Sequence, residues 1–244
     1  MSDYRGSERV GTQSLSIDQG LRAYMQRVYN YMAGGLVVTG AVAYGAYSAA
    51  VLPDGRTLTP FGQTMFHSPL PIVLMIATLG IVFALSMFLS RISAGTAQLL
   101  FWAYAALNGL TFSVLGLVYT QTSITRVFLI TAATFAVTSL YGYVTKRDLS
   151  AFGSFLFMGL IGLVIASLVN IFFQSSAVTF ALSVIGVLLF TGLTAYDTQS
   201  IKSTYYQSSG TLTLGHLAIS GALRLYLDFI NLFMSLLRLV GDRR

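Results

Sequence analysis

The sequence predicts an all-α membrane protein in which seven helices cross the bilayer as a bundle. Its 244 residues are 55% hydrophobic and only 9% charged, whereas charged residues make up about a quarter of an ordinary soluble domain. Uncharged apolar runs separate the few charges, and a membrane-spanning helix needs about 20 such residues. Soluble core helices are a poor alternative, because runs of this kind leave no polar face for water.

The apolar runs follow one another along the chain and are joined by short polar segments. We expect the seven helices at residues 28–52, 68–90, 96–119, 127–144, 151–173, 178–201 and 212–240. Transmembrane strands would instead show shorter runs that alternate in polarity. The predicted organisation is therefore an N-terminal tail at 1–27, a transmembrane domain at 28–241 and a C-terminal tail at 242–244.

Basic residues predict a cytoplasmic N-terminus, since Lys and Arg accumulate in cytoplasmic loops. This orientation places eight of them inside, namely Arg5, Arg9, Arg22, Arg27, Arg91, Lys146, Arg147 and Lys202, and leaves Arg56 and Arg126 in the opposite loops. Three arginines near the C-terminus conflict with it, because seven crossings would export them: Arg238, Arg243 and Arg244. Either export is tolerated, or the last segment re-enters the membrane without crossing.

Several classes of function find no support in the residues. The net charge of +6 comes from dispersed basic residues without a dense patch, so we expect no nucleic-acid partner. The chain has no cysteine and no His-Glu-x-x-His motif, and its glycines lack phosphate-loop spacing. We therefore expect a protein that is not an enzyme and has no cofactor. The first 27 residues lack the apolar stretch of a cleaved signal peptide, which fits a bacterial inner membrane.

Two carboxylates fall within predicted membrane helices, Asp197 in the sixth and Asp228 midway along the seventh. A charge there costs about 2.5–3.5 kcal/mol on insertion scales, so each is a functional candidate that needs a partner. If the two face each other, they would share one proton and sense pH, with Arg91 as a competing salt-bridge partner. From the sequence alone, Arg91 fits better as an anchor that reaches from the end of its helix to the membrane interface.

A simpler interpretation of the same residues stays open. Asp197 would then lie in interfacial water near Lys202, and Arg224 would neutralise Asp228 from one helical turn away. The spacing along the chain does not decide between a coupled pair and two independent aspartates.

Two segments resemble the closing signatures of the Bax inhibitor family, also called the transmembrane Bax inhibitor motif family. They are Ala195-Tyr-Asp-Thr-Gln-Ser-Ile-Lys202 and Leu225-Tyr-Leu-Asp-Phe-Ile-Asn-Leu-Phe-Met-Ser-Leu-Leu-Arg238, and a third segment, Ser139-Leu-Tyr-Gly-Tyr-Val-Thr-Lys-Arg-Asp-Leu-Ser150, is similar to the bacterial branch. The resemblance implies a last helix that is central and wrapped by the other six. It also implies that Asp197 and Asp228 form the family's aspartate pair and that Arg91 is its latch, whereas Arg224 departs from the family pattern as a modulator.

The resemblance implies a pH-sensitive calcium leak as the function, gated by Asp197, Asp228 and Arg91. The two aspartates would also contact calcium transiently, and the partners would be calcium ions, protons and the lipid bilayer. Two alternatives stay open: a non-conducting regulator that binds membrane proteins such as a quality-control protease, and a proton-coupled cation exchanger.

Overall fold

A computed structural model describes residues 4–53, 57–207 and 213–244, with side chains from residue 19 onward. Seven helices in it are long and apolar enough to cross a membrane, which confirms the predicted fold class. These spans are formed by α1 (Tyr4–Ala50), α3 (Leu70–Phe88), α4 (Ala94–Phe112) with the short α5 (Leu115–Val118), α6 (Gln121–Val144), α7 (Ser150–Phe173), α8 (Ser176–Gln207) and α9 (Leu214–Val240). Arg56 and the side chains of Arg5 and Arg9 fall outside the described part.

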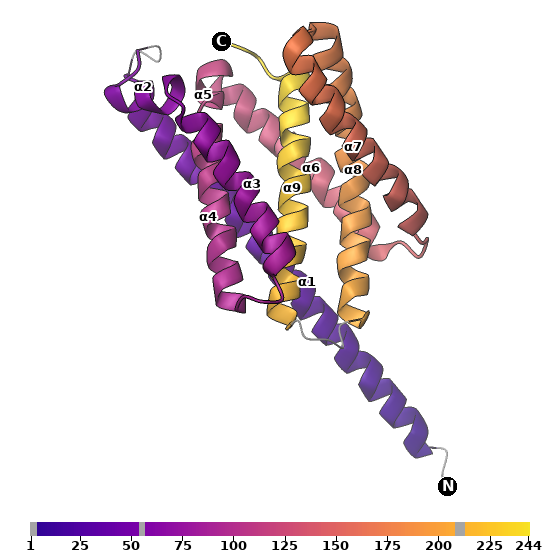
Figure 1. Ribbon diagram of the computed structural model, residues 1–244. Coiled ribbons are helices and arrows are strands. Elements are labelled where there is room, and N and C mark those ends of the chain that lie inside the picture. Colours follow the sequence, from indigo (N-terminus) through magenta and orange to yellow (C-terminus); the bar gives the residue numbers. More distant parts are fainter. Residues whose placement is uncertain (1–3, 54–56, 208–212) are drawn as a thin grey trace.

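Helix α9 is the centre of the bundle (Figure 1). In its most apolar 18-residue window 72% of the residues are buried, whereas the other six spans bury 6–39%. It packs mainly against α1, α4, α6 and α8, while α3 packs on α4 and α7 on α8. The expected central helix is confirmed, but its wrapping is an inner ring of four helices with α3 and α7 outside.

Hydroxyl side chains begin several of the helices by accepting a backbone N–H that has no partner within the helix. Thr59 caps α2 (Pro60–His67), which the apolar runs did not predict, Ser93 caps α4 and Thr120 caps α6. Helix α7 ends differently, at Gln174 with a left-handed φ of 49°. There Asn170 accepts a hydrogen bond from the Ser175 amide at 3.1 Å, which closes the tight turn into α8.

Helix α1 is much longer than the predicted first span. It covers 47 residues, and in Figure 1 its N-terminal part passes beyond the rest of the bundle. The predicted tail is therefore continuous with the first membrane helix from Tyr4 onward. That the tail lies in the cytoplasm stays a prediction.

The two ends of the chain lie at opposite ends of the bundle (Figure 1), which we call the N-terminal side and the C-terminal side. Helix α9 runs unbroken between them, which supports a last segment that crosses the membrane over one that re-enters it. The last residues pack on the connection between α5 and α6: the Thr120 amide donates to the Asp242 carbonyl at 3.1 Å and the Arg244 amide to the Val118 carbonyl at 3.0 Å. A salt bridge of 2.9 Å joins Arg126 and Asp242.

Candidate functional site: an aspartate pair in the bundle

Asp228 lies in the middle of α9 and faces the protein interior. It is 5% exposed, because α9 is covered on most of its circumference by the inner ring of helices. Its Oδ2 atom is buried and has no hydrogen-bond partner among the described residues. A buried polar atom without a partner costs free energy, so packing alone does not explain an aspartate at this position.

Asp197 on α8 meets Asp228 side chain to side chain. Helix α8 is held in place by α6, since Gly142 packs directly on the Ala195 backbone, where a Cβ atom would come within 2.2 Å of the Ala195 carbonyl oxygen. A 3.0 Å hydrogen bond between the Ser139 and Thr198 hydroxyls joins the same two helices. These contacts place Asp197 against the central helix.

Two carboxyl groups in contact can form a hydrogen bond only when one of them carries a proton, because an ionised carboxylate has no donor. The geometry therefore supports the coupled pair over two independent aspartates. Lys202, which the simpler interpretation placed near Asp197, donates instead to the Tyr143 carbonyl of α6 at 2.9 Å.

Arg224 on α9 supplies the nearest positive charge. Its Nη1 atom lies 4.0 Å from Oδ1 of Asp197, and the two side chains are 50% and 16% exposed. The same nitrogen donates to the Ser200 hydroxyl of α8 at 3.4 Å. The sequence suggested that Arg224 neutralises Asp228 on its own helix, but the side chain reaches across to α8 and forms its ion pair with Asp197.

Arg91 lies apart from the aspartates. It is exposed in the turn between α3 and α4, where its guanidinium is 5.9 Å from the centroid of the Phe88 ring. Throughout the described ranges it forms no ion pair. His216 contacts the same turn between α3 and α4. Its Nε2 atom lies 2.9 Å from the Ile92 carbonyl oxygen, which ties the start of α9 to this turn.

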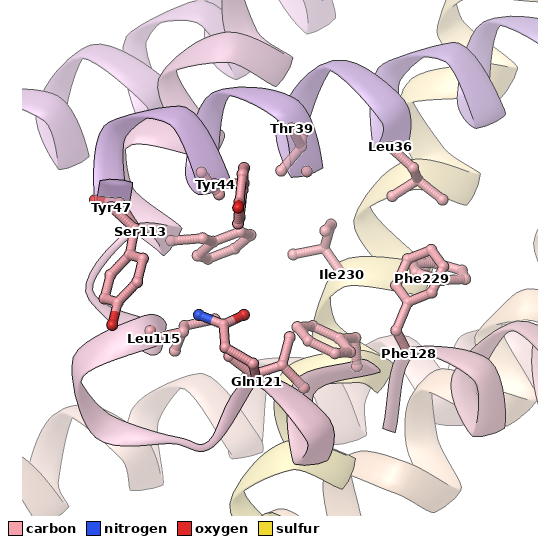
Figure 2. A pocket seen from close by; sticks show the side chains of 16 residues that line it. Leu36, Thr39, Tyr44, Tyr47, Ser113, Leu115, Gln121, Phe128, Phe229 and Ile230 are labelled. Atoms are coloured by element: carbon pink, nitrogen blue, oxygen red, sulfur yellow. The ribbon is translucent and has the colours of Figure 1, made fainter. Parts of the chain in front are cut away.

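An apolar cavity of about 160 Å³ lies between α1, α5, α6 and α9 toward the C-terminal side. Figure 2 shows Phe128, Phe229 and Ile230 around it, with Gln121 reaching toward α1. None of the four predicted site residues lines this cavity. It therefore takes no part in the chemistry of the aspartate pair.

A second hollow, which we call the polar groove, runs between α4, α7, α8 and α9 and has a volume of about 700 Å³. Six of the polar side chains that line it are Asn108, Asn170, Ser183, Asn231, Ser235 and Arg238. One signal was present in the sequence: polar residues at 224, 228, 231, 235 and 238 are three or four apart, so they form one stripe along α9.

Comparison with known proteins places the chain in a family. Residues 21–244 match the family described as Inhibitor of apoptosis-promoting Bax1. The chain belongs to the Bax inhibitor-1 family. The resemblance seen in its closing segments is thereby confirmed over nearly the whole length.

Relatives within the Bax inhibitor-1 family come from several bacteria. The inner membrane protein YbhL of Escherichia coli K12 is 48% identical over 229 residues, which cover 92% of this chain and 94% of that protein. The uncharacterized protein RP147 of Rickettsia prowazekii is 46% identical over the full length of both chains. An uncharacterized membrane protein of Streptococcus pyogenes is 36% identical over 95% of this chain and 96% of its own. The chain is a multi-pass membrane protein of this family.

Proposed function

We propose that the protein is a pH-sensitive cation leak of the bacterial inner membrane that carries calcium. The observation that carries the proposal is the buried contact between Asp197 and Asp228, in which one carboxylate oxygen has no partner. An ionisable group in the membrane interior usually marks an ion or proton pathway. The E. coli relative named as an inner membrane protein supports the location.

The ion pair between Asp197 and Arg224 provides a way for acid to open the protein. It links α8 to the central helix, and it exists only while the aspartate pair carries a negative charge. While the pair shares one proton and carries one charge, the ion pair can form. A second proton, taken up on acidification, removes that charge, and this ion pair between α8 and α9 is lost while their apolar packing remains.

Calcium would use the same carboxylates in passing. Ca²⁺ takes six to eight oxygen ligands, of which two aspartates supply only part, so water completes the shell. Incomplete coordination favours passage over storage, because an ion must bind weakly enough to leave.

Calcium flux into proteoliposomes, measured across pH 5 to 8, tests the proposal. We expect flux in the wild-type protein to rise as the pH falls. The double variant Asp197→Asn/Asp228→Asn carries no titratable pair, so its flux should no longer depend on pH. A wild-type protein without calcium flux at any pH would overturn the proposed leak.

The same assay separates the alternatives. An exchanger would move calcium only when a proton gradient is imposed across the membrane, whereas a leak needs only the calcium gradient. A regulator would show no flux and would co-purify with a membrane-protein partner. The latch role that the resemblance implies for Arg91 is tested by Arg91→Gln, which should raise flux at neutral pH if that residue closes the pathway.

A further inference from the structure

We propose that the polar groove is a water-filled vestibule that admits hydrated cations from the C-terminal side and brings them to within one helical turn of Asp228. This inference deepens the proposed function, and the role of the vestibule in calcium transport rests on that function. The groove itself can be tested without any flux measurement.

Part of the groove wall carries oxygen acceptors that suit the water shell of a cation. The amide nitrogen of Asn108 donates to the Tyr104 carbonyl at 3.0 Å, and that of Asn231 donates to the Leu227 carbonyl at 2.8 Å. The hydroxyls of Ser183 and Ser235 likewise donate to carbonyls of their own helices, each at 2.8 Å.

The hydroxyl donors of the two serines and one N–H of each asparagine are therefore used within the helices, whereas the oxygens of all four side chains keep free lone pairs. The water shell of a cation points its hydrogens outward and can donate to such oxygens. On these four side chains the water shell of an anion would find only the second N–H of each asparagine.

The free amide oxygens open into the groove. In the described ranges no residue donates to the amide oxygen of Asn108 or Asn231. A buried oxygen without a donor would count as unsatisfied, and among the described side chains only Asp228 Oδ2 does so. Both residues line the groove. Their oxygens are therefore accessible and need water there, because unsatisfied polar groups do not persist in contact with lipid.

The groove leads toward the aspartate pair. Asn231 follows Asp228 by three residues on α9, and Leu227, next to Asp228, also lines the groove. Helix geometry puts positions three apart on one face, about 4.5 Å along the axis. A cation beside Asn231 would therefore feel the negative charge of the pair.

Arg238 stands at the other end of the groove, on the last turn of α9. It is exposed and forms no ion pair with a carboxylate in the described part of the chain. Its positive charge at the mouth opposes the entry of cations, so the preference for cations that we infer arises deeper in the groove, beside the aspartate pair.

Single cysteines test the vestibule, because the chain contains none. Asn231→Cys and the control Ala133→Cys, an exposed residue midway along α6, are placed in liposomes. They are treated with membrane-impermeant methanethiosulfonates that carry either a trimethylammonium or a sulfonate group. Only a thiolate in contact with water reacts, so we expect Asn231→Cys to react at least about tenfold faster than Ala133→Cys with the cationic reagent.

Asn231→Cys should also react several-fold faster with the cationic than with the anionic reagent, and Asn108→Leu in the same background should slow the cationic reaction. Equal rates for the two cysteines, or equal rates for the two reagents, would overturn the inference. If the labelling is as expected but the protein shows no calcium flux, the vestibule is supported and the proposed leak is excluded. If calcium flux is measured but the cysteine is not labelled, the leak is supported and the vestibule is excluded.

Discussion

At the scale of single residues, the proposed response to pH depends on the ion pair of Arg224 and Asp197. It is 4.0 Å long and the arginine is half exposed, so water screens it and it contributes little to stability. A weak link suits a switch, because the loss of one charge is enough to release it.

The variant Arg224→Gln removes the positive charge that holds this link. We expect calcium flux at neutral pH to rise toward the acid level and the midpoint of the pH profile to move upward by about half a pH unit, since a nearby cation favours the charged carboxylate. The matched control is Arg126→Gln, which breaks the Arg126–Asp242 salt bridge on the C-terminal side. An unchanged pH profile in Arg224→Gln would exclude Arg224 as part of the switch.

Asp148 offers a local test of electrostatics outside the membrane spans. Its Oδ1 atom accepts the Ser150 amide at 2.9 Å at the start of α7, and hydrogen bonds from Ser150 lower the pKa of the Asp148 carboxyl. A lowered pKa in the folded state gives a contribution that is present above the unfolded pKa of about 3.9 and lost as the pH falls through the folded value.

We therefore expect Asp148→Ala to speed hydrogen exchange at the Ser150 amide at neutral pH, with the difference from wild type disappearing in strong acid. Asp148→Asn keeps an acceptor oxygen and should have the smaller effect. Equal exchange in all three proteins at pH 7 would show that this cap is not formed.

At the scale of elements, the close approach of α6 and α8 sets the position of Asp197. A Cβ atom on Gly142 would meet the Ala195 backbone, which cannot move aside as a flexible side chain can. By contrast, a Cβ atom on Gly45 of α1 would meet no atom within 4 Å.

Gly142→Val should therefore destabilise the protein by about 1–3 kcal/mol, the usual cost of overpacking, whereas Gly45→Val should be nearly neutral. Thermal unfolding in detergent measures both. Similar melting temperatures for the two variants would mean that α6 and α8 are not in contact at this glycine.

The sequence predicted the elements well where polarity alone decides them. Apolar runs located all seven membrane helices, although the sixth and seventh runs also contain charged residues. Helix α2 escaped notice because it is short and only partly apolar, although Thr59-Pro60 is a typical helix start. The extension of α1 to Tyr4 was missed because a change from apolar to polar residues marks a boundary of the membrane, not of a helix.

The candidate site was predictable only in part. Insertion cost singled out Asp197 and Asp228 one at a time, and the structure brings them together. The partner of Arg224 was not predictable, because i to i+4 spacing describes neighbours on one helix and this arginine reaches a second one. The polar groove joins α4, α7, α8 and α9, so no short segment contains its pattern.

At the scale of the whole molecule, an odd number of crossings fixes the relation of the termini. The two ends lie on opposite sides of the bundle (Figure 1). We predict a cytoplasmic N-terminus, since the loops and helix ends on the N-terminal side carry Arg91, Lys146 and Arg147.

Reporter fusions test this topology. A fluorescent protein that folds only in the cytoplasm should be active before residue 1 and inactive after Arg244, and alkaline phosphatase, active only outside, should give the opposite pattern. Activity of the same reporter at both ends would contradict seven crossings.

Both ends of α9 are fastened to neighbouring elements. On one side His216 holds the α3–α4 turn, and on the other side the segment just after α9 is tied to Arg126 and Val118. Because both of its ends are held, α9 resists sliding along its own axis. The helices least enclosed by the rest of the bundle are α3 and α7, whose apolar windows are only 11% and 6% buried.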